Sequence, residues 1–257
     1  MVMGIVNVTP DSFSDGAQFF SPEAAVARGR KLFGEGAAVV DIGGESTRPG
    51  ADPVPVKEEL ARVVDVVAGL APHGRVSIDT TKPEVARAAV AAGANILNDV
   101  SASMHEVAAE LNVTWIAVHR QGTPATMQVA PQYGDVVAEV GRFLLEAAER
   151  ALATGVPEVW LDPGIGFGKT TDHNLELLAN LRQLAERGAP VVVGASRKRF
   201  IGELHAHSDG CAEEEVPTDD RLEGSLAAAA WAFAQGAAVV RAHDVAATVG
   251  AMKVVAA

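Results

Sequence analysis

Short runs of aliphatic residues alternate along the chain with longer alanine-rich segments that carry charged residues at helical spacing. This alternation predicts repeated βα units whose strands form a parallel sheet. We predict eight strands, at residues 3–6, 38–42, 75–79, 95–99, 114–118, 158–162, 190–194 and 238–242. Eight units fill a chain of 257 residues, which favours one α/β domain, a (β/α)8 TIM barrel over residues 1–257. The main alternative, an open doubly wound sheet, normally has fewer strands and a nucleotide-binding loop after the first.

The predicted helices have recognisable first and last residues. Ser21 followed by Pro22 is typical of an N-cap with proline in the first helical position, and Pro83 opens a later helix in the same way. Several helices are predicted to end on a glycine that leads into the next strand. These glycines are Gly93, Gly155 and Gly236.

One segment interrupts this rhythm. Residues 201–220 are rich in His, Asp, Glu and Gly and poor in apolar residues, which predicts an exposed and mobile surface loop. His205 and His207 could each bind a metal ion, but the sequence offers no neighbouring residue that completes a site.

Composition and charge narrow the class of protein. The content of hydrophobic residues is 48%, which describes a globular enzyme rather than a disordered chain. The net charge of −12 argues against a nucleic-acid partner, and no apolar run is long enough to predict a membrane span. Cys211 is the only cysteine, which fits a reducing compartment, and the apolar start lacks the basic leader of a signal peptide. We therefore expect a cytoplasmic protein.

Polar residues gather where the predicted strands end, and active sites of α/β barrels form from the loops at these carboxyl ends. For Asp41 and Asp99, an N-cap of the following helix is as good an explanation as a place in the site. Asn7 taken alone could be a turn residue. The full set at the strand ends is Asn7, Asp41, Asp79, Asn98, Asp99, His119, Asp162, 196–198, Arg241 and His243.

A glycine-rich segment at residues 163–170 invites comparison with nucleotide-binding motifs. Its Gly168-Lys169-Thr170 ending is similar to a P-loop, but Pro163 occupies the position of the first glycine. A dinucleotide fingerprint also fails, because Lys169 stands where the last glycine belongs. The glycines are instead expected to let the loop pass close to a flat ligand.

Seven segments together resemble the ordered signature blocks of dihydropteroate synthases, over essentially the whole chain. They are GIVNVTPDSFSDG (4–16), DIGGESTRPGA (41–51), SIDT (77–80), NDVS (98–101), LDPGIGFGK (161–169), GASRKRFIG (194–202) and RAHDV (241–245). The resemblance implies a pterin-binding (β/α)8 barrel and a transferase of folate biosynthesis. Such an enzyme joins 6-hydroxymethyl-7,8-dihydropterin pyrophosphate to para-aminobenzoate, releases pyrophosphate, and is the target of sulfonamides.

The resemblance also assigns residues to the two halves of the pterin substrate. Carboxylates and amides suit the pterin edge, which presents a row of N–H donors beside acceptors, and a cation suits the acceptors. The implied pterin-binding residues are Asp79, Asn98, Asp162, Phe167 and Lys198. The implied pyrophosphate-binding residues are Asn7, Arg241 and His243, with Asn7 also holding Mg2+. The implied catalytic residues are Asp79, Lys198, Arg241 and His243.

The second substrate is expected to meet two loops that close over the site. The implied para-aminobenzoate-binding residues are Thr47, Arg48, Pro49 and Ser196. The implied substrate loop holds Thr9, Asp11, Ser12, Phe13 and Asp15. By resemblance we also expect a homodimer formed by outer helices, with the alanine-rich segment 226–234 and its Trp231 as a candidate surface; packing of that segment on the barrel is an equal alternative.

Two other functions are compatible with the same barrel. A methyltransferase that passes a methyl group from a reduced folate to a corrinoid protein would not need Arg48, Pro49 or the 4–16 block, all of which are present. A non-catalytic pterin-binding relative would have lost a pyrophosphate or loop residue. Those residues, Asn7, Arg48, Lys198, Arg241 and His243, are all intact.

Overall fold

The computed structural model describes residues 1–9, 21–46, 52–123, 126–212 and 216–257. Eight strands within these residues form one parallel sheet in the order β6-β5-β4-β3-β2-β1-β8-β7. They are β1 (Val2–Asn7), β2 (Val39–Gly43), β3 (Arg75–Asp79), β4 (Ile96–Asp99), β5 (Thr114–Val118), β6 (Val159–Asp162), β7 (Val192–Val193) and β8 (Val239–Ala242). A parallel bridge between Leu161 and Val191 links β6 to β7 and joins the two ends of the sheet. The predicted (β/α)8 barrel is confirmed, with β7 shorter than expected.

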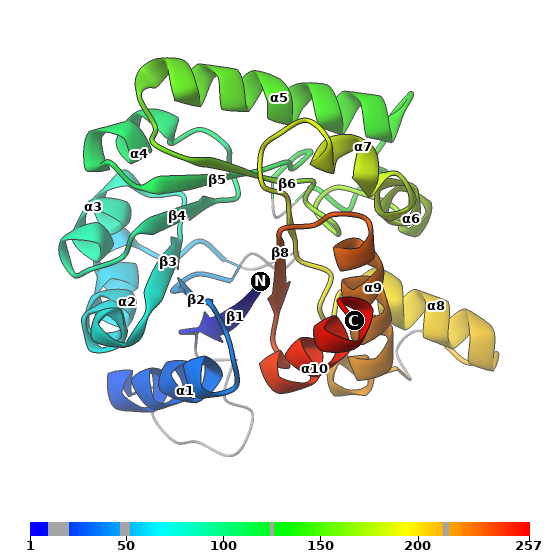
Figure 1. The fold of residues 1–257 in the computed structure, drawn as a ribbon, viewed down its shortest axis with the longest axis horizontal. Helices are drawn as coiled ribbons and strands as arrows, with labels where there is room; N and C mark the ends of the chain where they lie inside the picture. The colour runs from blue at the N-terminus through cyan, green and yellow to red at the C-terminus, as the bar shows by residue number, and fades with distance from the viewer. Residues whose placement is uncertain (10–20, 47–51, 124–125, 213–215) are drawn as a thin grey trace.

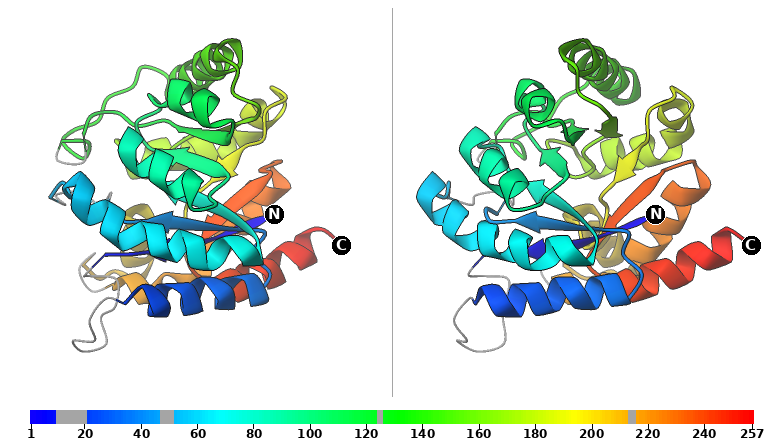
Figure 2. Two further views of the ribbon diagram at one scale, coloured as in Figure 1. Left: turned by 90° about the vertical axis from the view of Figure 1, so that its left-hand side faces the viewer. Right: turned by 60° about the vertical axis from the view of Figure 1, so that its left-hand side comes forward.

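Helices lie outside the strands on all sides (Figure 1). Those of the described residues are α1 (Pro22–Gly34), α2 (Val56–Leu70), α3 (Pro83–Ala91), α4 (His105–Leu111), α5 (Val136–Thr154), α6 (Thr171–Ala179), α7 (Leu181–Ala185), α8 (Arg199–Asp209), α9 (Leu222–Ala234) and α10 (Val245–Val255). Both chain termini lie at the same side of the molecule (Figure 2). Over the described residues, no helix combines the length and the apolar content needed to cross a membrane.

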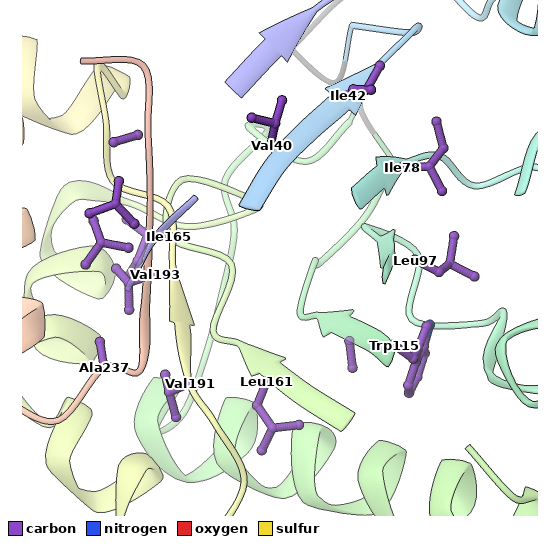
Figure 3. Close-up of a cluster of buried hydrophobic side chains, with 14 of the residues drawn as sticks. Val40, Ile42, Ile78, Leu97, Trp115, Leu161, Ile165, Val191, Val193 and Ala237 are labelled. Carbon is purple, nitrogen blue, oxygen red and sulfur yellow. The ribbon is translucent and has the colours of Figure 1, made fainter. Parts of the chain in front are cut away.

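The side chains of each strand alternate between two apolar environments, because successive Cβ atoms point to opposite faces. Outward residues such as Ile42, Ile78, Leu97 and Trp115 pack beneath the helices (Figure 3). Inward residues form a second cluster that fills the barrel. That cluster contains Met3, Val39, Ile96, Val100, Ile116, Val118, Trp160, Val192 and Val239. The strands are therefore apolar on both faces, as expected for a parallel sheet covered by helices.

The predicted ends of the helices are confirmed. Ser21 is the N-cap of α1, and its hydroxyl oxygen accepts a hydrogen bond from the backbone N–H of Ala24 at 3.2 Å. Gly155 caps α5 with a φ of 99°, a left-handed conformation that favours glycine. Gly93 and Gly236 have φ values of 115° and 96° and lead into β4 and β8 in the same way.

The prediction of a surface loop over residues 201–220 is wrong in its first half. Helix α8 continues to Asp209 and ends at Gly210, which has a φ of 68°. Phe200, Ile201 and Ala206 of this helix are buried, and their burial outweighs the polar composition around them. Residues 213–215 lie outside the described residues. Within the described chain, no group of three or more His, Cys, Asp or Glu side chains could hold a metal ion.

Asp99 has a structural role in the loop between β4 and α4. Its carboxylate is fully buried and accepts hydrogen bonds from the backbone N–H groups of Ser101 (2.9 Å), Ser103 (2.8 Å) and Met104 (2.8 Å). The indole N–H of Trp115 donates to it at 3.3 Å. Asp99 is therefore not the N-cap of α4, because that position belongs to Met104 and carries no side-chain cap; Asp99 instead fixes the loop between β4 and α4.

Replacing Asp99 with alanine should lower the free energy of unfolding by roughly 3 kcal/mol, because several buried N–H groups would lose their acceptor. The Asp99→Asn variant keeps one carbonyl oxygen and should lose about half as much. Urea unfolding of both variants and the wild type measures the series. An Asp99→Ala protein as stable as the wild type would contradict this role in the loop.

Candidate active site

The two-residue period of the strands places a polar layer directly above the core of the barrel. On four strands, the inward position that follows a core residue is polar. The pairs are Val39 and Asp41, Ile96 and Asn98, Trp160 and Asp162, and Val239 and Arg241. Asp79 at the end of β3 is in register with Asn98 of β4. These five polar residues from five strands therefore meet at the carboxyl-terminal mouth of the barrel, as predicted.

Arg241 lies between two carboxylates in this layer. Its Nε donates to Asp41 Oδ2 at 2.7 Å, and its Nη2 donates to Asp79 Oδ2 at 3.0 Å. The amide of Asn98 donates to Asp41 Oδ2 at 3.1 Å. Asp41 is fully buried, and its Oδ1 has no hydrogen-bond partner among the residues that the structure describes. Burial alone would lower the pKa of Arg241, but the charges of Asp41 and Asp79 raise it.

Asp79 is poised to change its charge near neutral pH. Burial raises its pKa from 3.8 to about 7, and the negative charge of Asp41 adds to this shift. The guanidinium of Arg241 opposes the shift without cancelling it. A carboxyl group in this state can bind N–H donors once it is ionised, and a ligand that supplies such donors stabilises the ionised form.

The opposite wall of the mouth combines Asp162, Lys198 and Phe167. Asp162 Oδ1 accepts from the backbone N–H of Gly164 at 2.7 Å, and burial raises its pKa while the charge of Lys198 opposes the rise. Burial lowers the pKa of Lys198 to about 8. The Lys198 ammonium donates to the carbonyl oxygen of Ile165 and lies 4.2 Å from the centre of the Phe167 ring. The structure thus brings together all five residues predicted to bind the pterin.

Ser196 and His243 form a pair at the edge of the layer. The Ser196 hydroxyl lies 3.0 Å from His243 Nδ1 and accepts from the backbone N–H of His243 at 3.2 Å. Arg197 supports this edge from outside through two hydrogen bonds to the Asp244 carboxylate, at 2.7 and 3.0 Å. Ser196 was predicted to contact para-aminobenzoate and His243 the pyrophosphate, so the two predicted substrate sites adjoin here.

The first predicted loop begins at the end of β1. Asn7 is half-buried, and its side-chain amide makes no hydrogen bond to the residues that the structure describes. Thr9 is buried. The other members predicted for this loop, Asp11, Ser12, Phe13 and Asp15, lie outside the described residues, as do Thr47, Arg48 and Pro49 of the second loop.

The stem of the second loop is held by charged side chains. Lys82 donates to the carboxylates of Glu45 and of Glu59, and Glu59 is fully buried. The Thr80 hydroxyl donates to Glu59 at 2.7 Å. Arg62 donates to the carbonyl oxygen of Gly44 at 2.7 Å. Residues 43–46 therefore leave β2 in a fixed direction, beside Asp79.

Two residues, Asp41 and Lys169, have a larger part in the site than the sequence indicated. An N-cap was an equal explanation for Asp41. Its position two residues after the inward-facing Val39 nevertheless indicates that its side chain also faces inward. Lys169 drew attention only as a mismatch to nucleotide motifs, yet it is buried and contacts His119. The glycines of residues 164–168 also have a reason beyond a ligand: a Cβ on Gly164 would lie 1.8 Å from the carbonyl oxygen of His119.

Comparison with known proteins gives a consistent result. The family described as "Pterin binding enzyme" matches residues 3–243. The chain is 46% identical to the dihydropteroate synthase of Escherichia coli K12 over 262 residues, which covers 99% of this chain and 90% of that protein. A solved dihydropteroate synthase of Xanthomonas albilineans with 4-aminobenzoic acid has a TM-score of 0.89 and 50% identity, covering 98% of this chain and 90% of that one. Its complex with 7,8-dihydropteroate has a TM-score of 0.85 and 48% identity, covering 98% and 91%.

The raised pKa of Asp79 predicts how stability depends on pH. As the pH rises from about 4 to about 7, the unfolded chain gives up the Asp79 proton before the folded protein does, so this group destabilises the fold above that window. The Asp79→Asn variant removes the effect. We expect it to unfold at a higher urea concentration than the wild type at pH 8, with the difference vanishing toward pH 4. A variant less stable than the wild type at pH 8 would show that the Arg241 pairing outweighs burial.

Proposed function

The chain belongs to the dihydropteroate synthases of the pterin-binding enzyme family, and from this premise we propose how its residues divide the substrates between them. The protein is a transferase that joins 6-hydroxymethyl-7,8-dihydropterin pyrophosphate to para-aminobenzoate and yields 7,8-dihydropteroate and pyrophosphate. The observation that carries the assignment is identity of 46% over 99% of the chain. The five predicted pterin residues, gathered at one end of the barrel, support it.

The pterin ring binds in the mouth of the barrel. Asp79, Asp162 and the carbonyl oxygen of Asn98 accept from the row of N–H groups along its edge. Lys198 donates to the ring acceptors and Phe167 packs on the ring face. Asp79 ends β3 and Asp162 ends β6, so the two carboxylates lie on different sides of the mouth. This supports the arrangement, because a flat ring between them meets an acceptor on each side.

The pyrophosphate lies toward Asn7, Arg241 and His243. The guanidinium of Arg241 donates through Nε to Asp41 and through Nη2 to Asp79. Pyrophosphate oxygens compete for its N–H groups, and the pterin N–H donors replace Arg241 as the partners of Asp79. Binding is thus an exchange of partners, in which the buried charges are never left uncompensated.

A magnesium ion completes the pyrophosphate site. The Asn7 amide suits it, because its oxygen is a hard ligand that makes no hydrogen bond to any described residue. The described chain offers no cluster of carboxylates or histidines for a metal, so Asn7 would share the ion with phosphate oxygens and waters. The bound ion supplies positive charge beside the leaving group.

Para-aminobenzoate enters last, from the side of the two loops. Arg48 binds its carboxylate, Pro49 packs on its ring, and Thr47 and Ser196 add polar contacts. Thr9, Asp11, Ser12, Phe13 and Asp15 of the first loop cover the site. The stem of the second loop supports this role, because Lys82 holds Glu45 just beyond the end of β2, beside Asp79.

The reaction needs positioning and charge rather than an enzyme nucleophile. The bond between the pterin methylene carbon and the pyrophosphate oxygen breaks, and its electron pair leaves with pyrophosphate. Arg241 and His243 stabilise that charge, while the ionised Asp79 stabilises the cation on the pterin. The neutral amine of para-aminobenzoate then forms the carbon–nitrogen bond and loses a proton to water. Lys198 keeps the ring aligned with the amine.

The proposal extends to the oligomeric state and the cellular compartment of the protein. A homodimer would form through outer helices of the last units, where the indole of Trp231 on α9 is 50% exposed. The Trp231 N–H donates to the carbonyl oxygen of Leu178 at 2.9 Å, so part of this side chain also packs on α6. The cytoplasm is the expected compartment, where the lone Cys211 would stay reduced.

The role of Arg48 can be tested with pyrophosphate release. With the pterin substrate and Mg2+, the purified wild-type protein should release pyrophosphate rapidly only when para-aminobenzoate is present. Arg48→Ala should lower kcat/KM for para-aminobenzoate on the order of 100-fold, because a charge-assisted hydrogen bond is lost. The control is Arg142→Ala, on the exposed face of α5. Full activity of Arg48→Ala would refute the assignment.

The role of Asn7 predicts a change in the demand for metal. Asn7→Ala should raise the Mg2+ concentration for half-maximal activity about tenfold, with smaller loss of rate at saturating Mg2+. Asn180→Ala, between α6 and α7, is the matched control. An unchanged Mg2+ dependence in Asn7→Ala would remove Asn7 from the metal site.

A further inference from the structure

The carbonyl groups of the loop at residues 164–168 are all held by side chains that lie outside the loop. Its three glycines have φ values of 66°, 82° and 61°, so its carbonyl groups point in several directions. Each of its five carbonyl oxygens accepts a hydrogen bond from a side chain. The donors are Lys169 to Gly164 and Phe167 (3.0 Å each), Lys198 to Ile165, Gln128 to Gly166 (2.9 Å) and Tyr133 to Gly168 (2.9 Å).

Lys169 is the centre of this network. It is 3% exposed, and its ammonium also lies 2.9 Å from His119 Nδ1. When Lys169 is charged its ammonium group has only donors, so Nδ1 accepts and the imidazole proton resides on Nε2. Burial and the charge of Lys169 lower the pKa of His119 to about 3, which keeps the ring neutral and available as an acceptor.

Burying an ammonium group costs free energy, because desolvation disfavours its charged form. Burial lowers the pKa of Lys169 to about 7, and the nearby charge of Lys198 adds to the shift. An apolar residue would avoid this cost but could not donate to Gly164 and Phe167 at once. Ile165 lies between the residues that carry these two carbonyls, and its own carbonyl oxygen accepts from Lys198. The ring of Phe167 lies against the ammonium of Lys198 as well.

We propose that Lys169 is a positioning residue that fixes the 164–168 loop against His119, and thereby sets where Lys198 and Phe167 meet the pterin. Lys169 itself does not touch the substrate. This inference rests on the proposed function, because it takes the ring to bind beside Lys198. Its consequence is that loss of Lys169 weakens the binding of the pterin substrate selectively, while para-aminobenzoate, whose proposed contacts include no residue of the 164–168 loop, is unaffected.

The test is calorimetric titration of the protein with 6-hydroxymethyl-7,8-dihydropterin pyrophosphate and Mg2+, beside steady-state kinetics for para-aminobenzoate. Lys169→Met keeps the length of the side chain and removes its donors. We expect its Kd for the pterin substrate to rise roughly tenfold, with unchanged stoichiometry and a KM for para-aminobenzoate within about twofold of the wild type. The matched control is Arg182→Met, which also removes a cation that donates to a backbone carbonyl at 3.0 Å, that of Ala234, but between outer helices.

A purely structural role would give another result: a lower melting temperature or fewer binding sites at an unchanged Kd, which would overturn the proposal. Tyr133→Phe removes one hydrogen bond from the same loop and serves if Lys169→Met does not fold. It should raise the pterin Kd about threefold with the KM for para-aminobenzoate unchanged, and no change would again overturn the proposal. Absence of pterin binding by the wild type would instead refute the proposed function and take this inference with it.

Discussion

The guanidinium of Arg241 lies between the carboxylates of Asp41 and Asp79, and this buried arrangement governs the groups around it. Without Arg241, two carboxylates on adjacent strands would face each other with no cation between them, and leaving buried charge uncompensated in this way costs about 3–5 kcal/mol. With it, Asp41 stays fixed while Asp79 retains a pKa of about 7. The mouth of the barrel is therefore compensated before any ligand arrives, and the proposed exchange of partners by pyrophosphate and pterin can follow.

The two sides of the mouth around Arg241, Asp41 and Asp79 are held in different ways. On the side of Lys198, side-chain donors hold every carbonyl of the 164–168 loop, so that wall is set before binding. On the side of Asp79, Lys82 and its two glutamates fix only the stem of the second loop. This division matches the proposed order, in which a prepared pocket takes the pterin first and the loops then meet para-aminobenzoate. In a reaction without an enzyme nucleophile, preorganised dipoles and charges do most to stabilise the transition state.

Much of this architecture could be predicted from the sequence, because strands and helices each leave a regular spacing of apolar residues. The alternation of aliphatic runs with amphipathic helices predicted the barrel, and the residues after each run predicted which side chains meet at its mouth. Prediction failed where tertiary packing decides: α8 extends through the polar residues His205 and His207 because Phe200, Ile201 and Ala206 are buried. The partners of Asp41 and Lys169 escaped for a related reason, since contacts between distant strands and loops leave no local pattern.

The most direct test of this account is proton release when the pterin binds. Asp79, with a pKa of about 7 in the ligand-free protein, is mostly protonated at pH 6 and must ionise to accept from the pterin edge. Calorimetric titration with 6-hydroxymethyl-7,8-dihydropterin at pH 6, in two buffers of different ionisation enthalpy, measures the exchanged protons. The account predicts release approaching one proton for each pterin bound, and little release at pH 9. Proton uptake, or no exchange at pH 6, would contradict it.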